Sequence, residues 1–483
     1  MAYEAVIGLE CHIQLATRSK MFCDCPVGFG AVANANVCPV CLGMPGALPR
    51  ANGAAIDAAL RLGLALGCAV REESVFARKN YFYPDMPKNY QITQYDRPLC
   101  EGGSVPVAVG GATRGFPLTR IHVEEDTGKS FHPEKHGDRR VSRVDFNRAG
   151  VPLLELVTEP AFREPAECAA FLTTLRRLVR WLGISEGDME KGHLRCDANV
   201  SLRVAGTSAF GTKTELKNLN SIKGVEKGIA AEIARQAGVL ESGGRIEQST
   251  LLYDADQDRL AVMRSKEHAH DYRYFPEPDL PVLVVDAAAR ERAARALPEL
   301  PWAREQRLAA EYAIPAYDAQ VLADQRELAD YFEDVAKSTN PKAASNWVMG
   351  KALSLMKEHG WSAADWAQRV PAKNLAKVIS AVESVAVTAT TGKSIVDEIA
   401  LSGADPEPLI ARNSAKSSSD DLLPLVRAVI DEHAGPVAQY LAGKTATLGF
   451  LVGQVMKKSG GQAVPQVVQE LLKAELAGRV TGG

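Results

Sequence analysis

The sequence predicts an α+β protein in which a mixed-sheet region comes first and helical regions follow it. Up to about residue 290, short segments alternate between apolar and polar residues, which is typical of half-buried strands. Helical segments at 52–67 and 165–183 interrupt these strands. Beyond that point the chain becomes rich in alanine, and a helical period runs through 287–313, 319–338, 342–358, 362–384 and 389–402.

Breaks in this pattern suggest three domains. Pro406 and Pro408 separate the alanine-rich segments from a last helical portion, 408–483. We therefore expect a sheet-containing domain over 1–292, a helical domain over 293–405 and a small helical tail domain over 406–483. The portion 408–483 holds eight Lys and Arg residues against six Asp and Glu residues, whereas the whole chain has a net charge of −3. RNA contact, if any, is therefore favoured in the tail.

The composition is that of an ordinary soluble globular protein, with 46% hydrophobic and 24% charged residues. No apolar run reaches the roughly 18 residues that a membrane span needs. The N-terminus carries neither the apolar core of a secretory signal nor an Arg-rich presequence. We expect a cytoplasmic protein that makes no contact with a membrane.

The stretch Tyr3–Leu15 is a candidate central strand with an acidic face. Its apolar residues occupy alternate positions, and Glu10, His12 and Gln14 occupy the positions between them. Successive side chains of a strand point to opposite sides, so these three polar groups share one face. A solvated strand face is the ordinary explanation, but histidine between polar groups is also a common metal-ligand setting.

Later strands add further carboxylates. The segment 119–130 alternates and then delivers Glu124, Glu125 and Asp126 before a glycine turn. Glu155 lies in an apolar strand, LLELV, where a carboxylate is costly unless it is paired or bound to metal. Glu155 is therefore one of the strongest single-residue indications of a functional site.

Three other regions carry polar side chains that suit phosphate or base contacts. Residues 193–203 place Asp197 on one face of a strand, and residues 211–221 place Glu215 and Lys217 on one face of another. A surface row of ion pairs explains the second pattern equally well. Residues 78–94 form a loop rich in aromatic and basic residues, suited either to base stacking or to packing on the core.

A cluster of four cysteines predicts a zinc site. Cys23 and Cys25 form a Cys-x-Cys pair, and Cys38 and Cys41 form a Cys-x-x-Cys pair after a short Gly/Asn-rich connection. Two thiolate pairs suit tetrahedral zinc, which is structural when all four thiolates bind because no ligand position stays open. Four free thiols are the alternative.

The carboxylates and the histidine fit a hard-cation site. The sequence holds neither a phosphate-binding G-x-x-x-x-G-K-[ST] loop nor a G-x-S-x-G nucleophile motif. No cysteine has the setting of a glutaminase nucleophile, so ammonia chemistry is not indicated in this chain. Oxygen ligands suit Mg²⁺ that bridges ATP phosphates. The residues alone therefore predict metal-dependent phosphate chemistry in a zinc-stabilised protein that contacts RNA.

The motifs taken together resemble those of a known family. GLECHIQL, CDC…CPVC, KNYFYPDMPKNYQITQ, HVEEDTGKS, DFNRAGVPLLELVTEP, LRCDANVSLR, GTKTELKNLNS and MRSKEHAHDYRYFPEPDL are similar, in this order, to motifs of the GatB/GatE group. The likeness spans the whole chain, and the tail resembles the YqeY-like RNA-binding domain of that family. The chain is too short to hold the synthetase-like insertion of the archaeal E type.

The resemblance implies an enzyme of the carbon–nitrogen ligase class, with glutamine as amido donor (EC 6.3.5.-). Such a protein uses ATP and Mg²⁺ to phosphorylate the side-chain carboxylate of Glu-tRNA(Gln) or Asp-tRNA(Asn). Ammonia from an A subunit, a serine amidase, then displaces the phosphate, and a small C subunit completes the heterotrimer. The alternative from another class is a non-catalytic, zinc-stabilised scaffold that presents tRNA to another enzyme.

Site residues carry over from the resemblance by motif. Glu10, His12, Glu125 and Glu155 are the expected catalytic residues and, with Glu124, the expected Mg²⁺ ligands. Glu124 is also a weaker candidate for a contact with ATP or with the aminoacyl end of tRNA. The other weaker candidates for these contacts are Lys79, Tyr81, Asp197, Glu215 and Lys217. The four cysteines are expected to hold structural Zn²⁺ as an aid to folding.

Overall fold

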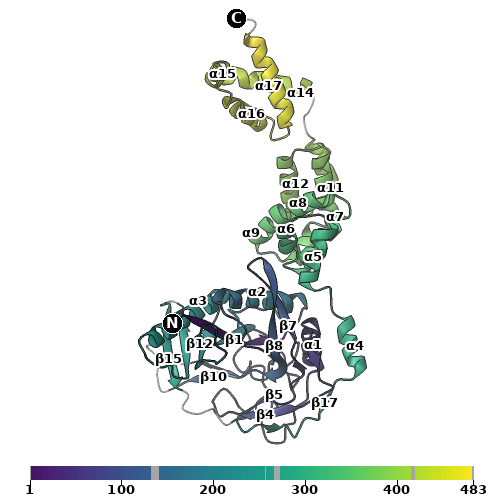
Figure 1. Cartoon of the computed structure of the whole chain (residues 1–483). Helices are drawn as coiled ribbons and strands as arrows, with labels where there is room; N and C mark the ends of the chain where they lie inside the picture. Colours follow the sequence, from purple (N-terminus) through teal and green to yellow (C-terminus); the bar gives the residue numbers. More distant parts are fainter. Residues whose placement is uncertain (1, 132–140, 256, 266–271, 415–418, 481–483) are drawn as a thin grey trace. The chain divides into compact units, whose positions relative to one another are not determined.

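The computed structural model describes residues 2–131, 141–255, 257–265, 272–414 and 419–480 (Figure 1). The chain divides into two compact units, Met1–Leu300 and Pro301–Gly483. The first unit is built on a mixed sheet and the second is helical, as the α+β prediction requires. The finer division at 292/293 and 405/406 stays a prediction.

A ten-stranded sheet forms the centre of the first unit. Its strands follow the order β15-β14-β13-β12-β1-β11-β8-β6-β2, and β7 pairs with β8. The pairing is antiparallel except between β13 and β14. The strands are β1 (Tyr3–Gln14), β2 (Ala69–Val70), β6 (Cys100–Glu101), β7 (Ser104–Val109), β8 (Ala112–Glu125), β11 (Pro152–Thr158), β12 (Leu194–Val204), β13 (Thr214–Leu219), β14 (Ser249–Asp254) and β15 (Arg259–Ser265).

Strand β1 is central, and its two faces differ as the alternation predicted. Ile7, Leu9, Cys11 and Ile13 are buried, whereas Glu10 and the other polar residues of the acidic face are only partly buried. Helices α2 (Pro165–Trp181) and α3 (Ile222–Glu241) pack on each other and on strands β7, β12 and β13 (Figure 1). The acidic face of β1 is therefore not filled by apolar core residues at Glu10, His12 and Gln14, and it can carry polar groups.

The remaining helices of the first unit are α1 (Gly53–Ala65) and α4 (Ala287–Arg295), which pack together. The first helix is capped by Asn52, whose side chain accepts a hydrogen bond from the Ala54 N–H at 3.0 Å. The second predicted helix begins at Pro165, where the missing N–H of proline costs nothing. Both helical predictions in this unit are therefore confirmed.

The structure corrects the prediction that 78–94 is a loop. Its two ends are strands of a small hairpin, and only 81–89 is loop. The prolines of the segment, Pro84 and Pro87, lie in that connection, so they remove no hydrogen bond from either strand. The small sheets contain β4 (Phe76–Asn80) with β5 (Tyr90–Gln94) and β16 (Phe275–Pro276), β3 (Glu73–Ser74) with β17 (Leu283–Val284), and β9 (Lys129–Phe131) with β10 (Arg143–Asp145). Residues 266–271, part of the polar-aromatic segment 265–280, lie outside the described residues.

The second unit is helical throughout its described elements. Its helices are α5 (Pro301–Glu311), α6 (Ala316–Leu322), α7 (Arg326–Ala336), α8 (Pro341–Trp347), the π-helix η1 (Val348–Ala352), α9 (Leu353–His359), α10 (Ala363–Arg369), α11 (Ala372–Glu383), α12 (Ala389–Ser402), α13 (Pro406–Arg412), α14 (Ser419–Glu432), α15 (Ala434–Leu441), α16 (Thr447–Lys458) and α17 (Pro465–Val480).

Prolines divide the predicted helical segments more finely than expected. The expected segment 287–313 is two helices, α4 and α5, since Pro298 and Pro301 cannot continue a helix between them. The expected segment 362–384 is likewise divided at Pro371. The predicted break before Pro406 is confirmed, because α12 ends at Ser402 and α13 begins at Pro406.

The last four helices enclose a small core of their own. Leu422, Val426, Leu451, Val468 and Leu472 are among its fully buried members. Helix α13 packs instead against α11 and α12. Among the described residues, no helix is both long and apolar enough to cross a membrane.

Candidate active site

Sheet register gathers the acidic side chains of three neighbouring strands. On β1, His12 lies opposite Glu155 of β11, and Glu155 lies opposite His122 of β8. Glu10 and Glu124 stand two positions away on their own strands, so they share this face. Residues from positions 10 to 155 of the sequence thus form one cluster, which we call the acidic cluster: Glu10, His12, His122, Glu124 and Glu155.

The acidic cluster contains two overlapping sets of metal-ligand atoms. Glu10, His12 and Glu155 form one set and His122, Glu124 and Glu155 the other, and the donor atoms of each set lie within 4.8 Å of one another. His12 Nε2 is 3.5 Å from Glu155 Oε2 and 3.7 Å from both Glu10 Oε1 and Glu124 Oε1. His122 Nε2 is 3.5 Å from Glu124 Oε2 and 3.6 Å from Glu155 Oε2. Glu155 therefore stands between the two sets.

The electrostatics of the acidic cluster favour positive charge. Burial alone would lower the pKa of His12, but its hydrogen bond to Glu155 and the charge of Glu124 outweigh burial and raise the pKa to about 9. Burial would raise the pKa of Glu155, yet His122 and His12 hold it well below its usual range. The pKa of Glu10 is raised, first by burial and then by the Glu155 charge. A site that draws a proton onto an imidazole also suits a cation.

Lys79 of β4 belongs to the surroundings of this cluster. Its ammonium group lies 4.9 Å from the centre of the Tyr272 ring. Burial lowers the pKa of Lys79, but the charges of Glu124 and Glu155 outweigh that effect and raise it. The lysine therefore stays protonated beside the acids.

Two arginines that the sequence reasoning did not single out also border the cluster. Arg120 Nη2 is 3.4 Å from Glu155 Oε1. Arg195 lies opposite His12 on β12, and its Nη2 donates to Asp126 Oδ2 at 2.8 Å. The alternation that marked Glu124 also places Arg120 on the same face, so the sequence did carry a signal for it.

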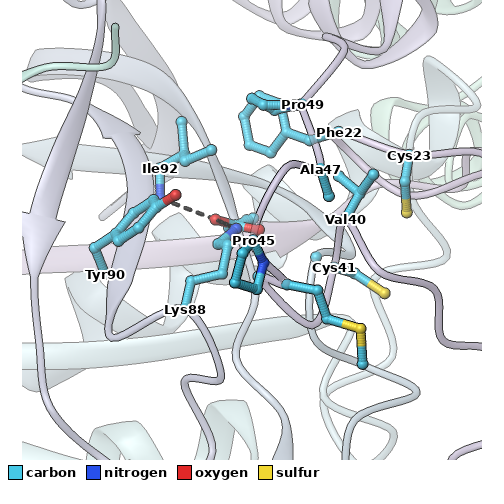
Figure 2. A pocket seen from close by; sticks show the side chains of 14 residues that line it. Phe22, Cys23, Val40, Cys41, Pro45, Ala47, Pro49, Lys88, Tyr90 and Ile92 are labelled. Carbon is cyan, nitrogen blue, oxygen red and sulfur yellow. Dashed lines mark hydrogen bonds and ion pairs between the residues drawn. The ribbon is translucent and has the colours of Figure 1, made fainter. Parts of the chain in front are cut away.

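Glu125 does not join the acidic cluster. It follows Glu124 on β8 and points the other way, where its carboxylate pairs with Lys88 Nζ and accepts from the Ile92 N–H at 2.9 Å. This carboxylate lines a cavity of about 200 Å³ in which Lys88, Tyr90 and Ile92 face the cysteine-bearing loop (Figure 2). The predicted metal role of Glu125 therefore has no geometric support from the other ligands, and it stays a prediction.

The weaker candidates fall into two places. Asp197 lies opposite Glu10 on β12, and Lys217 Nζ pairs with Asp197 Oδ2 at 2.5 Å and with Glu215 Oε1 at 3.1 Å. These three residues thus form an ion-paired row that adjoins the acidic cluster. Tyr81 lies in the loop after β4, where its ring stacks on that of Tyr83 with the two ring centres 5.8 Å apart.

The four cysteines of the predicted zinc site come together. The sulfur atoms of Cys23, Cys25, Cys38 and Cys41 all lie within 4.8 Å of one another. The pKa of the Cys41 thiol is lowered to about 4, first by its hydrogen bond with Cys23, and burial raises the pKa of Cys25 to about 11. The four-cysteine cluster thus holds one thiolate and further thiols. Because zinc binds thiolates, these thiols would lose their protons when the metal binds.

Comparison with known proteins gives the family. A family model described as the GatB/GatE catalytic domain matches residues 5–291, and a second, described as the GatB domain, matches residues 330–476. A protein of Chlorobium chlorochromatii (strain CaD3) is 48% identical over 481 residues, which is 99% of this chain and 100% of that relative. The chain belongs to the GatB/GatE family. The resemblance drawn from the motifs is thereby confirmed.

Other members of the GatB/GatE family match along the whole chain. The relative from Myxococcus xanthus (strain DK1622) is 47% identical over 479 residues, 98% of each chain. That from Carboxydothermus hydrogenoformans (strain ATCC BAA-161 / DSM 6008 / Z-2901) is 45% identical over 478 residues, 98% of this chain and 99% of its own. All three relatives are named as the B subunit of an aspartyl/glutamyl-tRNA(Asn/Gln) amidotransferase.

Proposed function

We propose that this chain is the component of a glutamine-dependent tRNA amidotransferase that activates and amidates the amino acid on tRNA. Its substrates are ATP and the side-chain carboxylate of Glu-tRNA(Gln), Asp-tRNA(Asn) or both. The acidic cluster, placed within a catalytic domain of the GatB/GatE family, is the observation that carries this proposal. It is surrounded by cationic side chains, as a site for a transferring phosphoryl group requires.

The acidic cluster fits a divalent cation by the chemistry of its donors. Three carboxylates supply oxygen ligands, and the set of Glu10, His12 and Glu155 is close enough to share one ion. When bound, Mg²⁺ supplies charge neutralisation for the ATP phosphates and for the phosphoryl group in transfer. Glu124 and His122 hold the second set, which adjoins the first through Glu155.

The residues of this chain then act by position and charge. The substrate carboxylate is already ionised at neutral pH, because free carboxyl groups titrate near pH 4, so no general base is needed for its attack on the γ-phosphate. Lys79 and Arg120 lie where they offset negative charge on the phosphoryl oxygens. The product is an acyl phosphate and ADP, and ammonia then displaces phosphate to give the amide.

Ammonia comes from partner chains in this proposal. An A subunit hydrolyses glutamine and a small C subunit completes a heterotrimer, since the relatives are named as one lettered component of a larger enzyme. The four-cysteine cluster holds structural zinc and takes no part in the chemistry. Residues 406–483 form a tRNA-binding tail.

The test is acyl-phosphate formation by the reconstituted complex. With Glu10→Gln, tRNA-dependent release of ADP from ATP should fall at least about a hundredfold, because a ligand for the phosphate-bridging cation loses its charge. Glutaminase activity of the complex should persist. The matched control is Glu4→Gln, on the same face of β1 but paired with Arg203, which should keep near-normal rates.

Two outcomes would contradict the proposal. Full acyl-phosphate formation by Glu10→Gln and His12→Ala would remove the acidic cluster from the chemistry. A wild-type complex that binds charged tRNA but never consumes ATP would favour the non-catalytic scaffold instead.

A further inference from the structure

Lys20 is a fully buried lysine beside the four-cysteine cluster, and its exposed fraction is 0%. Lysine is almost never buried this completely unless its charge is paired. Its Nζ donates to Cys41 Sγ at 3.5 Å and to the Phe146 carbonyl oxygen at 3.2 Å. Among the residues that the structure describes, no carboxylate forms an ion pair with Lys20, and the nearby Glu125 pairs with Lys88 instead. The sulfur is therefore the group that can balance this buried charge.

Cys41 is the most deeply placed member of the four-cysteine cluster. It is buried, whereas Cys23, Cys25 and Cys38 are only partly buried. Its Sγ also accepts from the Cys38 backbone N–H at 3.2 Å. Donors of this kind stabilise a negatively charged sulfur, and a charged donor does so most strongly. The sulfur of Cys41 therefore lies where a thiolate is stabilised from two directions.

The position of the lysine is set by the backbone around it. Gly150 has φ +86°, in the left-handed region that favours glycine, and a Cβ there would lie 3.4 Å from Lys20 Cδ and 3.5 Å from Cys41 Cβ. The Gly150 carbonyl accepts from the Met21 N–H at 2.7 Å, so the residue after the lysine is tied to the same turn. Lys20 is therefore held against Cys41 and is not a loose surface side chain.

A zinc ion bound to four thiolates needs a nearby cation. Four thiolates outnumber the two positive charges of Zn²⁺, so the bound cluster carries an excess of negative charge. Burying such an excess is costly unless a cation and hydrogen bonds offset it. Lys20 supplies both at the cysteine that is farthest from solvent.

We propose that Lys20 is a further component of the zinc site. Its ammonium group donates to the metal-bound sulfur of Cys41 and offsets part of the negative charge of the zinc–thiolate cluster. It thereby strengthens zinc binding and protects this sulfur from electrophiles. Lys20 acts through Cys41 and is a positioning residue, not a zinc ligand. This inference rests on the structural zinc of the proposed function and adds the residue that balances its charge.

The test measures the affinity of the full-length chain for zinc in competition with a chelator. Lys20→Met keeps a long apolar side chain but removes the charge and the donor, and it should lower the affinity at least about tenfold, as loss of a hydrogen-bond partner of a metal ligand usually does. Alkylation of Cys41 by iodoacetamide in the zinc-loaded protein should become faster. Lys351→Met is the control, because Lys351 is a partly buried lysine paired with Asp397 in the second unit.

Thermal unfolding with zinc and after chelation separates this role from simple packing. If Lys20 stabilises the metal-bound cluster, Lys20→Met should lower the Tm of the zinc-loaded protein more than that of the zinc-free protein, because weaker binding stabilises the folded state less. Equal shifts of Tm in both forms, with unchanged zinc affinity, would assign Lys20 to packing alone and overturn the proposal.

The outcomes also separate this inference from the proposed function. A reduced wild-type chain without zinc would overturn the zinc site and this inference together. A wild-type chain that holds zinc, compared with a Lys20→Met chain of the same zinc affinity and the same alkylation rate, would overturn the inference alone. Either result leaves the proposed chemistry at the acidic cluster to its own test with Glu10→Gln.

Discussion

The ion pair between Arg78 and Glu277 should stabilise the strands that carry Lys79, and the size of this effect can be predicted. Arg78 Nε and Nη2 each donate to a Glu277 carboxylate oxygen at 2.7 Å, and the Glu277 side chain is 0% exposed. The guanidinium group also lies 4.1 Å from the centre of the Tyr90 ring. The pair joins Glu277, the residue after β16, to β4, the strand that carries Lys79.

Removing the arginine should be costly because it leaves a buried carboxylate without its paired cation and with the Asp279 N–H, at 3.1 Å, as its remaining donor. Breaking a buried pair from one side typically costs about 3–5 kcal/mol, whereas an exposed pair contributes about 0–1 kcal/mol. Arg78→Ala should therefore destabilise this region by about 3 kcal/mol. Arg71→Ala is the matched control, since Arg71 pairs with Glu101 at 2.9 Å where the side chains are 38% and 41% exposed.

Hydrogen exchange measures the effect locally, which matters because a chain with two units need not unfold in one step. The Glu277 N–H bonds to the Phe76 carbonyl at 2.8 Å, and its exchange reports opening of β16 from β4. A loss of about 3 kcal/mol corresponds to exchange faster by more than about a hundredfold in Arg78→Ala. Equal exchange at this amide in Arg78→Ala and Arg71→Ala would refute the reasoning.

Two further predictions concern the zinc cluster and the tail. Reduced protein should contain about one zinc per chain, measured by mass spectrometry of the metal content. Cys38→Ser should lose this zinc, whereas the control Cys68→Ser should retain it. A reduced wild-type protein without zinc would exclude the four-thiolate site. A chain that ends at Ser414, and so keeps α13 on α11 and α12, should bind tRNA at least about tenfold more weakly in the complex yet keep glutaminase activity; unchanged tRNA affinity would remove the tail from RNA binding.

Much of the acidic cluster was predictable because period-two alternation is strong in the strands that build it. Glu10 and His12 share a face of β1, and Glu155 interrupts an apolar strand. Alternation also argues against one face for both Glu124 and Glu125, since neighbours on a strand point to opposite sides. That rule separates the two carboxylates as the structure does.

The order of the strands was not predictable from the sequence. Nothing local in the sequence says that β1 lies between β11 and β12, so the approach of His122 to Glu155 and of Arg195 to His12 needed coordinates. The strands at the ends of 78–94 are hidden in the sequence, because Pro84 and Pro87 between them are typical of a loop.

The central position of β1 has a consequence for how the protein is made. Glu10 pairs across the sheet with Val157 on one side and Asp197 on the other, so the earliest strand finds both partners only after most of the first unit has been synthesised. Such non-local pairing slows folding and keeps an apolar strand exposed meanwhile. The side chains of the acidic cluster come from β1, β8 and β11, so the proposed cation site forms only when these three strands have paired. If the proposed cation site is correct, cation binding distinguishes chains in which these strands have paired from partly folded ones.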